Sequence, residues 1–256
     1  MLHTVGMAID HYSAPFHLQS GASPRYLVLC DHASNAVPES YSALGMSARD
    51  LERHIAWDIG ARGVSEALAL KLDCPAVFGG TSRLLIDLNR DIDDSGSITA
   101  ENDNTFVPGN LSVSADERAS RVRQYYAPYH AHIEAHLDEQ LARRVKPILI
   151  SVHSFNAKMG GNERPWQVAL LWTQAREPVV PLIEWFAAQG FRVGENQPYD
   201  ARILGGHTIE QHALHRKLPH VIFEIRNNEI ETPRQQQEWG ELLHAAIVQT
   251  RFGLGE

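Results

Sequence analysis

The chain has 256 residues, 43% of them hydrophobic and 21% charged, and a formal net charge of −8. This is an ordinary globular composition, and its negative balance argues against a nucleic-acid partner. No apolar run approaches the roughly 20 residues that span a bilayer, so we expect no membrane partner either. The two cysteines, Cys30 and Cys74, form no CxxC motif, which predicts free thiols and a cytoplasmic location.

The first residues lack the basic-then-apolar layout of a secretory signal. We therefore expect a polar N-terminal arm over residues 1–24. No internal repeat, low-complexity tract or linker divides the rest, so residues 25–256 are predicted to form a single domain.

Short apolar runs alternate with helix-like segments along that domain. Ser47 and Asp50 have the spacing of a helix N-cap, and a helix is expected from there to Leu72. The alternation predicts an α/β fold, a three-layer sandwich with a mostly parallel central sheet. The expected strands cover 26–30, 76–80, 84–88, 147–152, 166–172, 191–196 (at an edge) and 220–225. The other expected helices cover 116–144 (broken or kinked near Pro128), 181–189, 207–216 and 232–251. A long loop over 91–115 is expected to cover a site.

Polar residues follow or end several of the expected strands. His32 comes after the first run, Asn89 and Arg90 after LLIDL, and His153 after PILISV. In a parallel sheet, ligands bind beyond the carboxyl ends of the strands. We therefore expect these side chains to meet at one edge of the sheet.

Two of these residues, His32 and His153, are the expected ligands of one zinc ion per chain. Catalytic zinc sites commonly have two His and one carboxylate, with a further position for water. Asp58 is the candidate third ligand, because Asn35 offers only a neutral amide oxygen; the alternative is that Asp58 is a helix-face carboxylate paired with His54.

One carboxylate of the sequence lies inside an apolar run. Glu224 lies in HVIFEI, and burial demands a partner, a metal or a raised pKa. We expect Glu224 to be the general base that takes a proton from water. The alternative is a structural salt bridge to an arginine. Arg226 is expected to stabilise the oxyanion or to hold Glu224 in place.

Arginines flank the LLIDLN run. Guanidinium groups bind carboxylates in a bidentate fashion, so Arg83 and Arg90 are expected to hold an anionic substrate group. The alternative is that Asp87 and Asp91 neutralise them. His207, which follows two glycines before an expected helix, is predicted to cover or polarise the substrate. A metal beside such a clamp predicts hydrolysis of a small acidic substrate near its carboxylate.

Six motifs in order resemble the N-formylglutamate amidohydrolase family, which is similar in turn to aspartoacylases and zinc carboxypeptidases. The resemblance runs from about residue 25 to 245. The motifs are DHASNAVP, ERHIAWDIGA, SRLLIDLNRD, the YYAPYH segment at 125–130, SVHSF and FEIRNN.

The resemblance implies a zinc carboxypeptidase-like fold and roles for individual residues. His32 and His153 match the two zinc histidines, and Glu224 matches the catalytic glutamate. Asn89 and Arg90 match the pair that binds the substrate carboxylate, with Arg83 as the additional arginine.

One position departs from the pattern. Asn35 stands where the relatives have a glutamate ligand, which is why Asp58 enters the expected zinc site. We expect a zinc-dependent hydrolase that cleaves the amide bond of an N-acylated acidic amino acid such as N-formylglutamate. The alternatives are a zinc carboxypeptidase or cell-wall peptide amidase, and a non-catalytic carboxylate-binding relative that has lost the metal.

Overall fold

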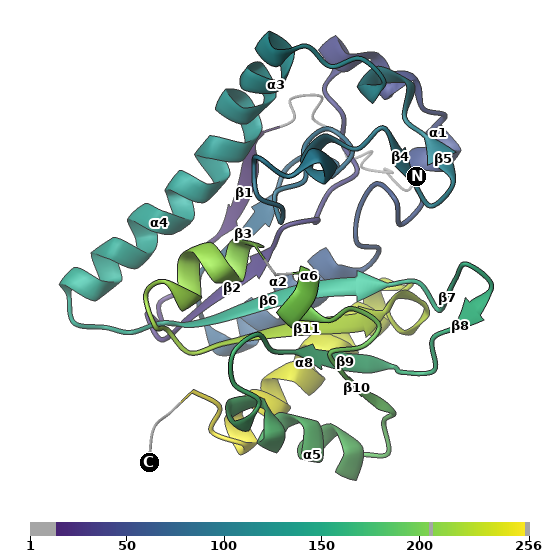
Figure 1. The fold of residues 1–256 in the computed structure, drawn as a ribbon. Helices are drawn as coiled ribbons and strands as arrows, with labels where there is room; N and C mark the ends of the chain where they lie inside the picture. The colour runs from purple at the N-terminus through teal and green to yellow at the C-terminus, as the bar shows by residue number, and fades with distance from the viewer. Residues whose placement is uncertain (1–13, 205–206, 254–256) are drawn as a thin grey trace, which may run out of the picture.

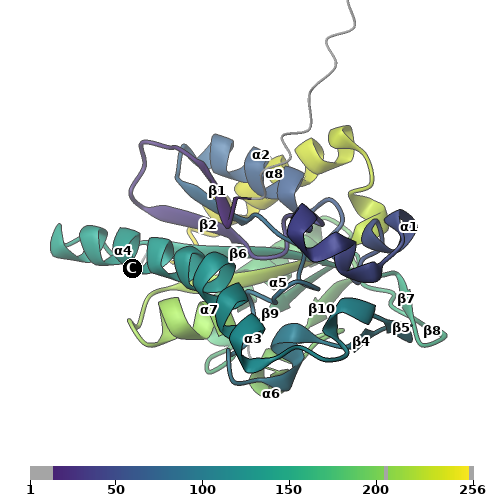
Figure 2. The ribbon, with the colours of Figure 1, turned by 90° about the horizontal axis from the view of Figure 1, so that it is seen from above.

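A seven-stranded sheet runs through the centre of the molecule, between two layers of helices (Figures 1 and 2). The computed structural model describes residues 14–204 and 207–253. The strand order is β1-β3-β2-β6-β11-β9-β10. The strands are β1 Phe16–Gln19, β2 Tyr26–Cys30, β3 Ala76–Gly79, β6 Ile148–Phe155, β9 Val168–Leu171, β10 Val193–Glu195 and β11 His220–Arg226. Two small hairpins lie outside this sheet: β4 Glu101–Asn102 with β5 Thr105–Phe106, and β7 Lys158–Met159 with β8 Asn162–Glu163.

Helical segments connect these strands. The α-helices are α1 Ala48–Leu51, α2 Ala61–Leu72, α3 Ala115–Arg121, α4 Ala127–Ala142, α5 Val180–Ala188, α6 Ala201–Leu204, α7 His207–Ile209 and α8 Pro233–Gln249. Two π-helical segments, η4 Val122–Tyr126 and η6 Glu210–Leu214, continue α3 and α7. The 3₁₀ segments are η1 Glu39–Gly45, η2 Ser95–Ile98, η3 Pro108–Asn110, η5 Glu177–Val179 and η7 Asn227–Glu229.

Both faces of the sheet are buried, which explains why its central strands are apolar throughout. In β2, Tyr26, Val28 and Cys30 pack with α2, α5 and α8. Leu27 and Leu29 point the other way and pack with η4 and α4. The three-layer α/β sandwich is therefore confirmed.

The sheet is mixed and mostly parallel, as predicted. Strands β3, β2, β6 and β11 are parallel neighbours at its centre. At one side β1 is antiparallel to β3, and at the other β9 is antiparallel to β11 and parallel to the edge strand β10.

The predicted N-terminal arm is wrong for the part that the structure describes. Residues 16–19 form β1, so the sheet begins before residue 25. The signal in the sequence is weak because this edge strand is only partly buried, and Leu18 is 56% exposed. Residues 1–13 of the expected arm lie outside the described residues.

The helix predicted from Ser47 to Leu72 is two helices. Ser47 does cap α1, accepting a hydrogen bond from the Asp50 N–H, but α1 ends at Leu51 and α2 starts only at Ala61. Gly60 precedes α2 with φ +79°, a left-handed conformation that favours glycine. Asp58 therefore lies in an irregular segment and not on a helix face.

Two further predictions need correction. Residues 84–88 form a buried turn and not a strand. The helix is not broken near Pro128, because the chain passes from α3 through the π-helical η4 into α4 with Pro128 in the first turn of α4; the alternative, a kink there, stays a prediction. The π-helical turn just before Pro128 shifts the hydrogen bonding to i−5, as the bond from the Ala127 N–H to the Val122 carbonyl shows, and this accommodates a residue without an N–H.

The expectations for cysteines and membrane spans can be compared with the structure. Cys30 and Cys74 are both free and buried. Among the described residues, no helix combines the length and the apolar character needed to cross a membrane.

Gly60→Ala is expected to lower the free energy of unfolding by about 2–3 kcal/mol, since it places a side chain in a left-handed conformation. A Cβ at this position would also lie 2.3 Å from the Ile230 carbonyl oxygen. Gly190→Ala is the matched control, because Gly190 has φ +87° but nothing within 4 Å of its added Cβ. Urea unfolding should show a larger loss in the free energy of unfolding for Gly60→Ala than for Gly190→Ala. Equal losses would mean that the contact with Ile230 does not contribute.

Candidate active site

A cavity of about 390 Å³ lies where β2, β6 and β11 end. Eight of the nine residues predicted for the site line it: His32, Asp58, Arg83, Asn89, Arg90, His153, His207 and Glu224. The rest of its described lining is His54, Asp87, Asp91, Asp94, Ser154, Leu171, Tyr199, Ala201, Glu210, Gln211, His215 and Ile222. Asp91 and Asp94, at the start of the 91–115 segment, are its only residues in the described lining, so a cover formed by this segment stays a prediction.

The strand register brings His153 and Glu224 side by side. They are direct partners in the parallel pairing of β6 with β11, and paired residues of neighbouring strands point to the same face. Both residues lie within their strands, since β6 extends to Phe155 and β11 to Arg226.

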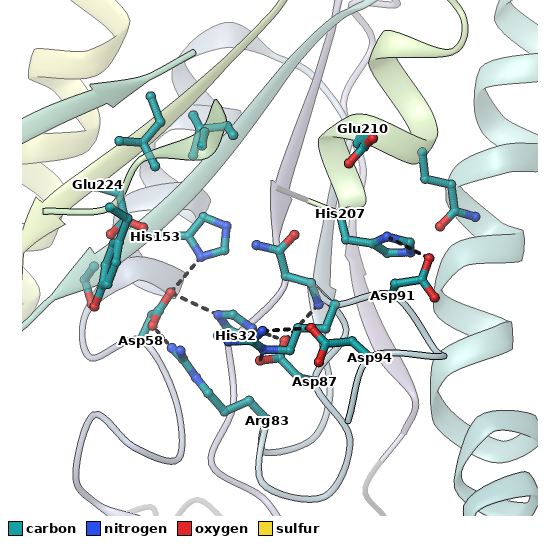
Figure 3. A pocket seen from close by; sticks show the side chains of 18 of the residues that line it. His32, Asp58, Arg83, Asp87, Asp91, Asp94, His153, His207, Glu210 and Glu224 are labelled. Atoms are coloured by element: carbon teal, nitrogen blue, oxygen red, sulfur yellow. Dashed lines mark hydrogen bonds and ion pairs between the residues drawn. The ribbon is translucent and has the colours of Figure 1, made fainter. Parts of the chain in front are cut away.

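Three side chains converge on one point of the cavity (Figure 3). Asp58 Oδ2 lies 3.3 Å from His32 Nδ1 and 2.8 Å from His153 Nδ1. One potential ligand atom from each of these residues lies within 4.8 Å of the others, and all three residues are buried. Two imidazole nitrogens and one carboxylate oxygen form a donor set that suits zinc. The residues present therefore fit the expected metal.

A second carboxylate lies behind each imidazole. His32 Nε2 is 2.7 Å from Asp87 Oδ1, and His153 Nε2 is 3.3 Å from Asp31 Oδ2. Carboxylates in this position fix the tautomer and orientation of metal-binding histidines. Asp31 was not among the predicted site residues, and Asp87 was considered only as a partner for arginines.

Electrostatics favours a neutral His32. Burial and the nearby Arg83 charge lower the pKa of His32, and neutral imidazole is the form that binds metal. The pKa of Asp87 falls to about 2, because interaction with His32 and Arg83 outweighs the burial that would raise it.

Glu224 lies next to this group without a salt bridge. It is 7% exposed, and its Oε2 atom has no hydrogen-bond partner. Within the described part of the chain, no ion pair joins it to an arginine. Burial raises its pKa to about 7, although the charges of His153 and Arg83 oppose the shift. A carboxylate with such a pKa can accept and return a proton near neutral pH.

The two expected clamp arginines are already paired. Arg83 donates to Asp58 Oδ1 through its guanidinium group. Arg90 Nη1 is 3.0 Å from Asp94 Oδ2, and Arg90 Nε is 3.6 Å from Asp87 Oδ2. Arg90 is the more accessible of the two, with 46% of its side chain exposed against 17% for Arg83.

Asn89 and His207 lie at the same end of the cavity as Arg90. Asn89 Oδ1 accepts a hydrogen bond from the Thr208 N–H at 3.0 Å. His207 Nε2 is 2.7 Å from the Tyr126 hydroxyl. Asn89 thus holds the start of α7, which carries His207, against the cavity.

Arg226 is not brought to the site. It is absent from the described lining of the cavity and pairs instead with Glu229 and Asn228. Asn35 is also engaged elsewhere, because its side-chain amide donates to the Leu51 carbonyl at 2.9 Å.

Comparisons with known proteins give a family and two similar structures. The family model for N-formylglutamate amidohydrolase matches residues 25–230. A gene product of Agrobacterium tumefaciens has a similar structure, with a TM-score of 0.89 at 27% identity over 94% of this chain and 96% of that one. An N-formylglutamate amidohydrolase from Ralstonia eutropha shares the fold, with a TM-score of 0.72 at 20% identity over 94% of this chain and 100% of that one. A search of curated protein sequences gives no significant match. Because the family model covers well over half of its length, the chain belongs to the N-formylglutamate amidohydrolase family.

Proposed function

We propose that the chain is a zinc-dependent amidohydrolase that removes the acyl group, a formyl group in the first instance, from a small N-acyl amino acid. The observation that carries this proposal is the convergence of His32, His153 and Asp58 beside the buried, unpaired carboxylate of Glu224. Family membership supports the amidohydrolase chemistry. N-formylglutamate, which gives the family its name, is the substrate expected from the sequence.

His32, His153 and Asp58 would hold the zinc, whose chemistry is to lower the pKa of a water molecule and to polarise a carbonyl oxygen. Arg83 holds the second oxygen of Asp58. Asp87 holds the far nitrogen of His32, and the far nitrogen of His153 lies 3.1 Å from Ser151 Oγ and 3.3 Å from Asp31 Oδ2. The binding groups are therefore positioned before any ligand arrives, which reduces the entropy lost on binding.

Glu224 moves the proton in this proposal. Its unpaired oxygen takes a proton from the attacking water, and the same carboxyl group then delivers that proton to the leaving nitrogen of the amide. The pKa of about 7 suits both directions of transfer. The products are a free amino acid and a small carboxylate, which is formate when the acyl group is formyl.

Arg90 is the proposed partner of the substrate's α-carboxylate. Its exposed guanidinium group lines the cavity and keeps donors beyond the single bond to Asp94. Arg83 has the role of holding Asp58, and Asn89 the role of holding α7. We assign no step to Arg226, because its contacts lie outside the cavity.

An assay of N-formyl, N-acetyl and N-succinyl amino acids, followed by the release of free amine, tests this function. We expect turnover of the N-formyl compounds, its loss after treatment with a chelator, and its return with zinc. The control for Arg90 is the same compound with its α-carboxylate replaced by a carboxamide. This compound cannot pair with Arg90 and should be turned over poorly. Equal rates with and without the free carboxylate would contradict the proposed role of Arg90, and no turnover of any acyl compound would contradict the proposed function.

A further inference from the structure

The cavity wall opposite His153 and Glu224 is acidic. Asp91, Asp94 and Glu210 lie on that side (Figure 3). No ion pair of Glu210 is found within the described residues.

Two described groups lie against this wall: Arg90, which pairs with Asp94, and His207, whose Nδ1 atom lies 4.0 Å from Asp91 Oδ2. Arg83 and Arg90 are the only guanidinium groups among the described lining residues, and no lysine lines the cavity there. Arg83 is paired with Asp58, and Arg90 is shared between Asp94 and Asp87. One exposed arginine remains to meet one carboxylate of a substrate.

The net negative charge of the cavity lining disfavours a substrate that carries a second carboxylate. Its carboxylates are Asp58, Asp87, Asp91, Asp94, Glu210 and Glu224. Glu224 is only partly ionised near neutral pH, because its pKa is about 7. The other five alone outnumber the two guanidinium groups and the two charges of one zinc ion together when the histidines are neutral. A dicarboxylate such as N-formylglutamate would bring two further negative charges into this field, which like-charge repulsion opposes.

The apolar part of the cavity wall suits the uncharged methylene groups of a substrate side chain. Leu171, Tyr199 and Ile222 line the cavity together with the acidic groups. Such a surface can accommodate the methylene groups of a long side chain, whose polar end then reaches carboxylates.

We propose that the substrate is an N-acyl amino acid with one carboxylate only, whose side chain ends in an amide or an ammonium group. This rests on the proposed function and revises the amino acid, not the reaction. Arg90 meets the α-carboxylate, and Glu210 with Asp91 meets the end of the side chain.

Binding to the zinc-loaded Glu224→Gln variant, measured by calorimetry, tests this proposal without turnover. The ligands are Nα-formyl-L-glutamate, Nα-formyl-L-glutamine and Nα-formyl-L-lysine. We expect the last two to bind at least about tenfold more tightly than the first. Equal or tighter binding of Nα-formyl-L-glutamate would overturn the proposal.

Turnover of the same three compounds by the unmodified enzyme separates this proposal from the proposed function. If the binding order is as expected but none is hydrolysed, the substrate class holds and the proposed reaction fails. If N-formylglutamate is hydrolysed fastest, the reaction holds and the substrate class fails. If none of the three binds, both are contradicted.

Glu210→Gln tests the acidic wall itself. We expect the ratio of kcat/KM for the lysine compound to that for the glutamate compound to fall by about three- to fivefold, the usual size for one exposed charge. Asp93→Asn is the matched control, because Asp93 is an exposed acid that is not part of the described lining. For Asp93→Asn, the same ratio of kcat/KM values should stay within about twofold of that of the unmodified enzyme. Equal changes in the two variants would show that overall charge, and not this wall, sets the preference.

Discussion

Glu224→Gln is expected to lower kcat by about 10²–10⁴-fold, the usual contribution of a general acid–base group. Glutamine has nearly the same shape, but its amide cannot take the proton from the attacking water or return it to the leaving nitrogen. The substitution also removes a carboxylate that has no hydrogen bond at Oε2, so it leaves no buried partner unpaired. Steady-state release of the free amino acid measures the effect.

The control for this variant is its metal content. Glu224 is not one of the three converging residues, so zinc should remain at about one ion per chain by elemental analysis. KM should change much less than kcat, because the lost interaction belongs to the transition state. Activity within a few fold of the unmodified enzyme would show that another group is the base.

Asp58→Asn is expected to abolish tight zinc binding and, with it, turnover. An amide oxygen is neutral, so the site would keep only the two imidazoles as strong ligands. The loss in zinc affinity should exceed the roughly 10- to 100-fold that changes behind the ligands cost. A competition titration with a chelator of known affinity measures it.

Asn35→Ala is the matched control, since position 35 is where the family resemblance leads one to expect a ligand. The Asn35 side chain donates to the Leu51 carbonyl, so its removal should leave zinc affinity unchanged. Circular dichroism checks that both variants fold, because Asp58→Asn also changes the partner of the buried Arg83. If Asn35→Ala loses zinc and Asp58→Asn keeps it, the proposed ligand set is wrong.

The central strands and the ends that carry His32, His153 and Glu224 could be predicted because each strand is a continuous apolar run. LLIDL is such a run too, yet it forms a buried turn. Its backbone groups are satisfied by distant side chains: Asn110 donates to the Leu84 carbonyl, Arg121 to the Leu85 carbonyl and His130 to the Leu88 carbonyl. These partners come from other parts of the chain, so a local hydrophobic pattern cannot distinguish this turn from a strand.

Asp58 was predicted to lie in a helical segment, but it lies in an irregular segment between α1 and α2. The periodic apolar residues around it favour one helix, and only the left-handed Gly60 separates α2 from the segment that carries Asp58. The pair with His54 does exist, at 3.5 Å, so this alternative and the convergence with His32 and His153 are compatible.

The carboxylates behind the imidazoles were harder to predict. Asp87 meets His32 across 55 positions of sequence, and the pairing depends on the path of the 84–88 turn. Asp31 directly precedes His32 but faces His153. The usable signal was the presence of acids within or beside apolar runs, because a buried carboxylate needs a partner.

For Arg226, the strand pattern predicted a place in the site that the folded chain does not give it. It lies two residues after Glu224 in the same strand, and this spacing favours a shared face. At the end of β11, however, η7 supplies Glu229 as a nearer partner. Proximity in a strand therefore did not bring Arg226 into the cavity.

Zinc titration of the metal-free protein, with release of formate from an N-formyl amino acid followed at each step, tests the central claim most directly. We predict that activity is absent without metal, rises in proportion to added zinc and stops rising at one ion per chain, as a single site at His32, Asp58 and His153 requires. Full activity in the metal-free protein, or a rise that continues to two ions per chain, would contradict that claim.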